Sequence, residues 1–142
     1  PAMKRKIKFR AWSHKDGDML SWMLLSQSAF NRDNCHLMYD VFTQPGFNNT
    51  GYTLMQFTGN TDKSKKEIYE GDIMKIQLPV GGFWGNTPIE KTGVVRYEAE
   101  CGGFIVEWEY SKNQHHIILD CDIAYTGEVI GNTFHDPTLI KH

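Results

Sequence analysis

The chain has 142 residues, a formal net charge of −2 at pH 7 and 40% hydrophobic residues. This length favours one domain with a substantial core, and the lack of any long apolar run argues against a membrane-spanning helix. Its cysteines, Cys35, Cys101 and Cys121, are odd in number and form no Cys-x-x-Cys pair, which argues against a disulfide framework. No secretory signal is recognisable, so we expect a cytoplasmic protein without a membrane partner.

The charge is unevenly divided along the chain. Residues 1–76 carry eleven Lys and Arg against eight Asp and Glu, a net +3, whereas residues 77–142 carry four against nine, a net −5. Such asymmetry indicates either an anionic partner for the first half or complementary surfaces in a homo-oligomer.

The first predicted element is a half-buried strand over residues 4–12. Apolar and polar residues alternate there, so one face is apolar and the other is mainly basic. The mainly basic face contains Lys6, Lys8, Arg10 and Trp12. Asp16-Gly17 then predicts a tight hairpin whose return strand begins at Met19, and residues 22–30 fit a short helix or an irregular packed segment.

The middle of the chain predicts two strands around a polar loop. After a less regular region with a predicted strand at residues 37–42, strands are expected at residues 52–58 and 72–76. The segment between them has no apolar period and carries Lys63, Lys65 and Lys66. We interpret it as a mobile surface loop.

Residues 79–88 hold three glycines and two prolines, which predicts a long loop. Phe83 and Trp84 stand at its centre. Large aromatic side chains on a loop either pack into the core, their commoner fate, or contact a partner.

The second half is dominated by a predicted hairpin, residues 93–100 and 104–110 around a Cys-Gly-Gly turn. Its alternation matches Val95 and Tyr97 with Phe104 and Val106, and Arg96 is expected to pair with a glutamate across the strands. An exposed loop follows at residues 111–116, then short strands at 117–119 and 128–130 and a helical turn starting at Asp136-Pro137.

These elements predict a mainly β fold with minor α. Residues 52–142 are expected to form a small antiparallel barrel, SH3-like by fold-level analogy alone. Residues 3–51 are expected to add an N-terminal hairpin and short-helix extension, and the two parts to form one compact unit.

Three runs resemble the YopX family of small bacteriophage and prophage proteins. They are MKRKIKFRAW near the start, MQFTGNTDKSKKEIYEGDIMKI in the middle and GEVIGNTFHDPTLI near the end. The resemblance implies a phage-encoded, β-rich and oligomeric protein inside the bacterial host cell, and it brings no catalytic motif. Residues 13–51 and 78–88 depart from the family pattern, so any function of those segments is left open.

No residue pattern indicates an enzyme, a metal or a cofactor. Cys101, His115, His116 and Cys121 lack the paired spacing of a zinc site, and no phosphate-binding glycine loop precedes a helix. We expect Cys121 to be a buried, unreactive thiol.

Two functions remain. The first is a non-enzymatic, oligomeric protein-interaction module in which Phe83 and Trp84 contact an unidentified phage or host protein or a second copy. The alternative is a nucleic-acid-binding accessory protein, although a sequence pI near 6.3 argues against a dedicated binder. Its predicted contact residues are Lys4, Arg5, Lys6, Lys8, Arg10, Trp12, Lys63, Lys65 and Lys66.

Overall fold

The computed structural model describes residues 6–28, 35–46, 50–78 and 89–140. The chain divides into two compact units, Pro1–Phe57 and Thr58–His142. The division falls inside strand β3 (Tyr52–Thr61), whereas the sequence predicts a boundary just before that strand. Each unit is described here by itself.

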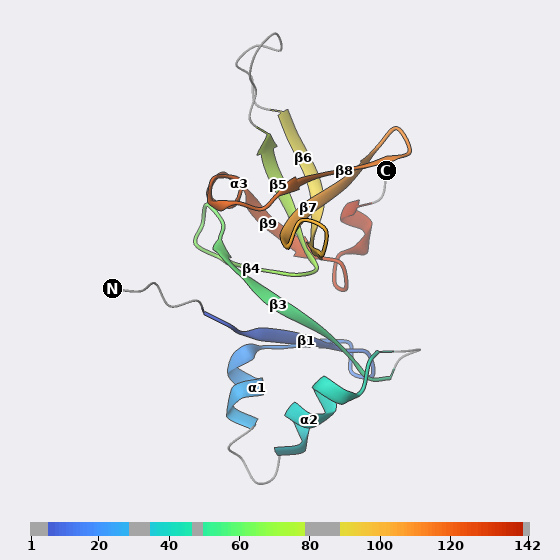
Figure 1. The fold of residues 1–142 in the computed structure, drawn as a ribbon. Helices are drawn as coiled ribbons and strands as arrows, with labels where there is room; N and C mark the ends of the chain where they lie inside the picture. The colour runs from blue at the N-terminus through green and yellow to red at the C-terminus, as the bar shows by residue number, and fades with distance from the viewer. Residues whose placement is uncertain (1–5, 29–34, 47–49, 79–88, 141–142) are drawn as a thin grey trace, which may run out of the picture. The chain divides into compact units, whose positions relative to one another are not determined.

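The first unit is a small sheet with two helices (Figure 1). Strand β1 (Phe9–Ser13) lies between β2 (Asp18–Leu20) and the first part of β3. Both neighbours are antiparallel to β1, and Ala11 lies opposite Leu20 and Leu54. The hairpin predicted at Asp16-Gly17 is confirmed, with Gly17 at a φ of 67°. The strand itself begins at Phe9, later than predicted.

The helices are α1 (Trp22–Ser28) and α2 (Cys35–Thr43). The short helix predicted after Trp22 is confirmed, but the strand predicted at residues 37–42 is wrong. Leu37, Met38 and Val41 have helical spacing and pack together against the core formed by Ala11 and Leu25. Six mostly apolar residues are too few to separate a helical period from a strand period, so packing decides.

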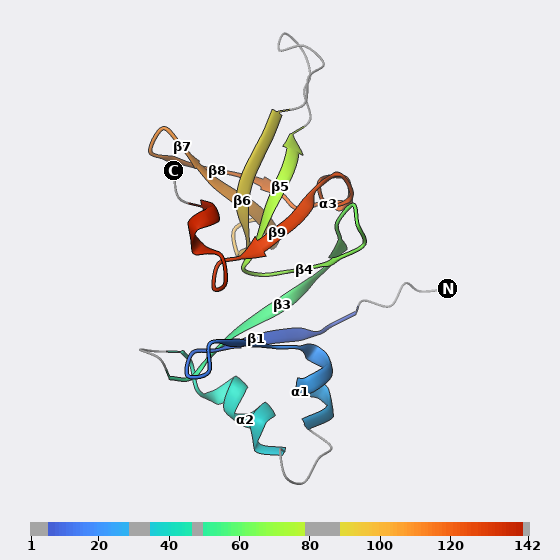
Figure 2. The same ribbon diagram turned by 180° about the vertical axis from the view of Figure 1, so that it is seen from behind.

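The second unit is built on a five-stranded antiparallel sheet in the order β8-β7-β6-β5-β9 (Figure 2). Its strands and short helices are β4 (Glu67–Tyr69), β5 (Asp72–Leu78), β6 (Ile89–Glu98), β7 (Gly103–Tyr110), β8 (Asn113–Ile118), α3 (Cys121–Thr126), β9 (Glu128–Asn132) and the 3-10 helix η2 (Pro137–Ile140). The sheet is curled like half of a barrel. The predicted class, mainly β with an antiparallel barrel-like sheet and an N-terminal extension, is confirmed.

The core of this unit is formed by the sheet together with β4 and α3. Its buried members are Ile68, Met74, Ile76, Val95, Val106, Leu119, Ile123, Ala124 and Val129. The predicted β6–β7 register is confirmed, because Val95 lies opposite Val106 and Tyr97 opposite Phe104.

The exposed loop predicted at residues 111–116 is wrong. Only Ser111 and Lys112 form the turn, both at positive φ, and β8 begins at Asn113. His115 and His116 are therefore strand residues, although both are exposed. The predicted turn at Asp136-Pro137 is confirmed as the start of η2. None of the helices in the described part of the chain has the length and apolar character needed to cross a membrane.

Candidate functional site

The predicted basic face of β1 is only partly open. Arg10 and Trp12 lie on the face opposite Ala11, as alternation predicts, but both are half-buried. The Lys8 ammonium lies 4.8 Å from the centroid of the Phe57 ring, a cation–π contact. Lys6 is exposed, and Lys4 and Arg5 lie outside the described residues. Part of the cationic surface expected for nucleic acid is thus in contact with the protein itself.

Lys63, Lys65 and Lys66 belong to the second unit, and their side chains are exposed, as predicted. Their backbone is held by the buried Asp62 carboxylate. Asp62 Oδ1 accepts hydrogen bonds from the amides of Ser64 (2.8 Å) and Lys66 (2.9 Å), and Oδ2 accepts one from the Val129 amide of β9 (2.9 Å). The interpretation of a mobile loop overlooked this anchor.

The anchor also sets the ionisation of Asp62. Burial raises the pKa of this carboxyl, but the hydrogen bonds from the Val129, Lys66 and Ser64 amides outweigh burial, so the pKa lies below its ordinary value of 3.8. Asp62 is therefore a structural anion that joins the lysine loop to β9.

Phe83 and Trp84 lie outside the described residues. The structure instead exposes a different set of large apolar side chains, which belong to α1 and α2. Their exposed fractions are Met23 67%, Leu24 45%, Tyr39 69% and Phe42 50%. We call this set the helix surface. Sequence reasoning missed it, although α1 carries no charged residue and begins with four consecutive apolar residues, more than one covered helix face requires.

Two rings of this first unit help to fix the helices on the sheet. Phe9 of β1 contacts Trp22 of α1 at a centroid distance of 6.2 Å and Phe42 of α2 at 5.7 Å. Phe42 therefore belongs to the helix surface and also contacts the sheet, and the two ring contacts hold α1 and α2 against β1.

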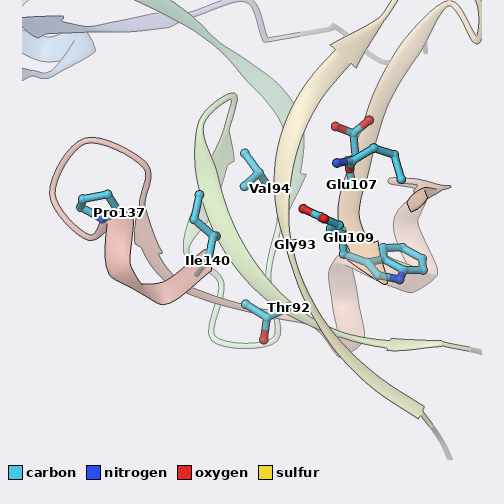
Figure 3. Close-up of a pocket in the computed structure, with 9 residues that line it drawn as sticks. Thr92, Gly93, Val94, Glu107, Glu109, Pro137 and Ile140 are labelled. Carbon is cyan, nitrogen blue, oxygen red and sulfur yellow. The ribbon is translucent and has the colours of Figure 1, made fainter. Parts of the chain in front are cut away.

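A second candidate site is a groove in the second unit, between β6, β7 and η2 (Figure 3). It is an open hollow of about 620 Å³ that continues into a second one of about 330 Å³, and the two share Thr92, Trp108, Glu109 and Ile140. In Figure 3, Val94 and Thr92 come from β6, Glu107 and Glu109 from β7, and Pro137 and Ile140 from η2. We call this site the β6–β7 groove.

The carboxylates around the groove differ in their partners. Glu107 Oε2 accepts hydrogen bonds from Arg96, whose Nε is 2.9 Å away, and the same guanidinium lies 2.7 Å from Glu98. The hydrogen bond to Glu107 contributes most to raising the pKa of Arg96, and the hydrogen bond from Arg96 lowers the pKa of Glu98 below 4.5. The cross-strand pair predicted for Arg96 is confirmed. Glu90 and Glu109 also line the groove, and Glu90 accepts a hydrogen bond from the Gln77 side chain at 3.0 Å.

The cysteine and histidine candidates are not brought together. Among the described residues, no group of three His, Cys, Asp or Glu side chains is placed to hold a metal ion. Cys101 and Cys121 are both exposed free thiols, so the prediction that Cys121 is buried is wrong. Cys121 begins α3, whose inward positions are taken by Ile123 and Ala124. His115 stacks on Trp108 with a centroid distance of 6.1 Å.

Comparison with known proteins agrees with this architecture. A solved structure, protein EF1440 from Enterococcus faecalis, is similar with a TM-score of 0.56 and 22% identity over 97% of this chain and 100% of that one. This likeness concerns the fold alone. No curated protein matches. The family model described as YopX protein matches residues 8–141, nearly the whole chain, and the chain therefore belongs to the YopX family.

Proposed function

We propose that the chain is a non-enzymatic protein-interaction module that associates with copies of itself in the bacterial cytoplasm, where it serves a phage process by docking onto a phage or host protein. The observation that carries this proposal is the helix surface. Its four large apolar side chains are exposed on two helices that contact each other. Monomeric proteins seldom expose large apolar patches, and such patches usually mark contacts with other proteins.

The helix surface has the chemistry of an interface core. Met and Tyr are enriched at protein contacts, and charged residues are depleted there. Met23 and Tyr39 project furthest, with 67% and 69% of their surface exposed. Full burial of one such side chain contributes about 1.5–3 kcal/mol. A second copy of the same surface offers a matching apolar layer through a twofold contact.

The experiment measures the mass of the chain by light scattering across a concentration series. We expect an oligomer whose dissociation constant rises by about tenfold or more in Met23→Gln/Tyr39→Gln, since that factor corresponds to about 1.4 kcal/mol. Tyr125→Gln is the matched control, because Tyr125 is 75% exposed but belongs to α3 of the second unit and is not part of the helix surface. A chain that stays monomeric at high concentration, or a control that dissociates equally, refutes the proposal.

Nucleic-acid binding is a second candidate function, favoured by the position of Arg10 and Trp12 on one face of β1, with Lys8 directly before the strand. A phosphate-driven complex weakens steeply between about 50 and 200 mM salt. Titration of a fluorescent oligonucleotide at both concentrations tests it, with Lys6→Glu/Lys8→Glu expected to abolish binding. No binding at the lower concentration eliminates this function.

A further inference from the structure

The β6–β7 groove arises because two neighbouring strands part. The register that pairs β6 with β7 runs from Glu98–Gly103 to Val94–Glu107 and ends there. Beyond this point β6 continues to Ile89 beside β5, while β7 continues to Tyr110 beside β8. Figure 1 shows the β5–β6 pair and the β7–β8 pair diverging from each other. Residues 89–93 and 108–110 therefore line the opening with strand backbone on both sides, which is the setting for an added strand.

The side chains of the groove select for a particular kind of segment. Pro137, Leu139 and Ile140 of η2 give it an apolar wall, and Leu139 is 43% exposed. Among the described lining residues the carboxylates Glu90, Glu107 and Glu109 outnumber the cation Lys91, which gives the groove an excess of negative charge. Lys91 also contributes to the lining, but alternation along β6 directs it to the face opposite Glu90. The fitting ligand is an extended peptide that carries both cationic and apolar side chains.

We propose that the β6–β7 groove binds the segment Lys4-Arg5-Lys6-Ile7 of a second copy of this chain as an added strand. This inference rests on the proposed self-association and names the segment and the site that take part. The segment has three consecutive positive charges followed by Ile7, which is 58% exposed and stands two residues before the start of β1 at Phe9. An extended segment can direct Lys4 and Lys6 to one side and Ile7 to the other.

The net charges of the two units agree with this pairing. Residues 1–57 carry seven Lys and Arg against four Asp and Glu, a net +3, and residues 58–142 carry eight against thirteen, a net −5. The donor segment therefore belongs to the positive unit and the groove to the negative unit. Opposite net charges favour encounter of the segment with the groove of another copy and fix which surfaces meet.

The first test uses a fluorescent synthetic peptide of residues 3–8. It is titrated into the full chain carrying Lys4→Glu, Arg5→Glu and Lys6→Glu, so that the chain's own segment does not compete. We expect saturable binding at about 50 mM salt that weakens strongly at about 300 mM, because the contacts are between exposed charges. Adding Glu90→Gln and Glu109→Gln to the chain should weaken binding by about tenfold, equivalent to about 1.4 kcal/mol.

The matched control is Glu100→Gln with Asp122→Asn, which removes the same amount of charge outside the groove. Both residues are exposed, in the β6–β7 turn and in α3. We expect the control to bind the peptide as the parent chain does. Absence of binding at low salt, or equal weakening by the control, overturns the proposal, since the attraction would then reflect net charge alone.

The second test asks whether the segment comes from another copy. One chain carries the three reversals in its segment, and another carries Glu90→Lys and Glu109→Lys in its groove. Only their mixture contains an intact segment and an intact groove, on different chains. Energy transfer between dyes on the two chains should appear in this mixture. It should fall when one chain carries both sets of changes and the other carries neither, because the unchanged chain then docks only onto its own kind.

The two proposals fail in different ways. Self-association by light scattering with no peptide binding overturns the groove proposal and leaves the interaction module standing. Peptide binding by a strictly monomeric chain overturns both the module and the assignment of the segment to a second copy.

Discussion

Replacing Asp62 by asparagine should destabilise the second unit more than its small change in size suggests. The carboxylate is 3% exposed and accepts three backbone hydrogen bonds from Ser64, Lys66 and Val129. An asparagine keeps one acceptor oxygen but turns an amide donor toward one of these N–H groups. The best arrangement keeps the oxygen on the loop and leaves the buried Val129 amide facing the new NH2 group.

The magnitude follows from that lost contact. A hydrogen bond to a charged group contributes about 1.5–3 kcal/mol, and a buried N–H left without a partner costs about 1–3 kcal/mol. We therefore expect Asp62→Asn to lower the free energy of unfolding by about 2–4 kcal/mol. For a unit of this size, that corresponds to a fall in Tm of roughly 10–25 °C.

Two measurements check this. Urea unfolding gives the free energy of unfolding, and amide hydrogen exchange reports directly on the Val129 N–H group. The control is Asp120→Asn: Asp120 Oδ1 accepts the Ile123 amide at the start of α3 (2.9 Å), and asparagine serves equally well there. Equal stability of the two variants, or unchanged exchange at Val129, would refute the reasoning.

The pH dependence has a definite sign. The folded-state pKa of Asp62 lies below 3.8, so the unfolded chain takes up this proton first as the pH falls. The stabilisation is complete well above pH 3.8 and is lost as the pH drops through the folded-state value. The difference between the parent chain and Asp62→Asn should therefore shrink below that pH, and a difference that grows there contradicts the assignment.

Two further predictions concern the β6–β7 hairpin. Gly93→Ala places a Cβ 2.6 Å from the Glu107 carbonyl oxygen, so it should lower the free energy of unfolding by about 1–3 kcal/mol, whereas Gly103→Ala meets nothing within 4 Å and is the control; calorimetry of the two variants checks this. Arg96→Gln should raise the pKa of Glu98 toward 4.5, as followed by NMR titration, because the Arg96 hydrogen bond is the main cause of the lowered value. An unchanged Glu98 titration would contradict that cause.

Some of this fold could be predicted because its signals are local. The β6–β7 hairpin has an unbroken two-residue period and a glycine turn, so both its register and the Arg96 ion pair follow from the sequence. The helix α2 could not be predicted in the same way. Its inward residues, Leu37, Met38 and Val41, reveal a helical face only when the sheet beneath them is known.

The candidate sites were harder to predict because they depend on distant pairings. Asp62 accepts a hydrogen bond from the Val129 amide, 67 positions away in the sequence, and no local sequence pattern near either residue predicts this contact. Predicting the β6–β7 groove requires knowing where the two paired strands separate. The alternation of apolar and polar residues along either strand does not show that point. By contrast, the exposed apolar residues of α1 could have been predicted from the local sequence. One buried helix face does not require Met23 and Leu24 in addition to Trp22 and Leu25.

The helix surface and the β6–β7 groove differ in the force that would hold a second copy, so salt separates them. The helix surface associates by burial of Met23 and Tyr39, and salts that are excluded from protein surfaces strengthen such burial. The groove depends on Glu90 and Glu109, whose attraction for a cationic segment is screened as the Debye length falls from about 10 Å at 0.1 M to about 3 Å at 1 M salt. An assembly that uses both contacts should lose the docked segment first and keep its oligomeric state. Loss of both at the same salt concentration would mean that the two surfaces form one interface.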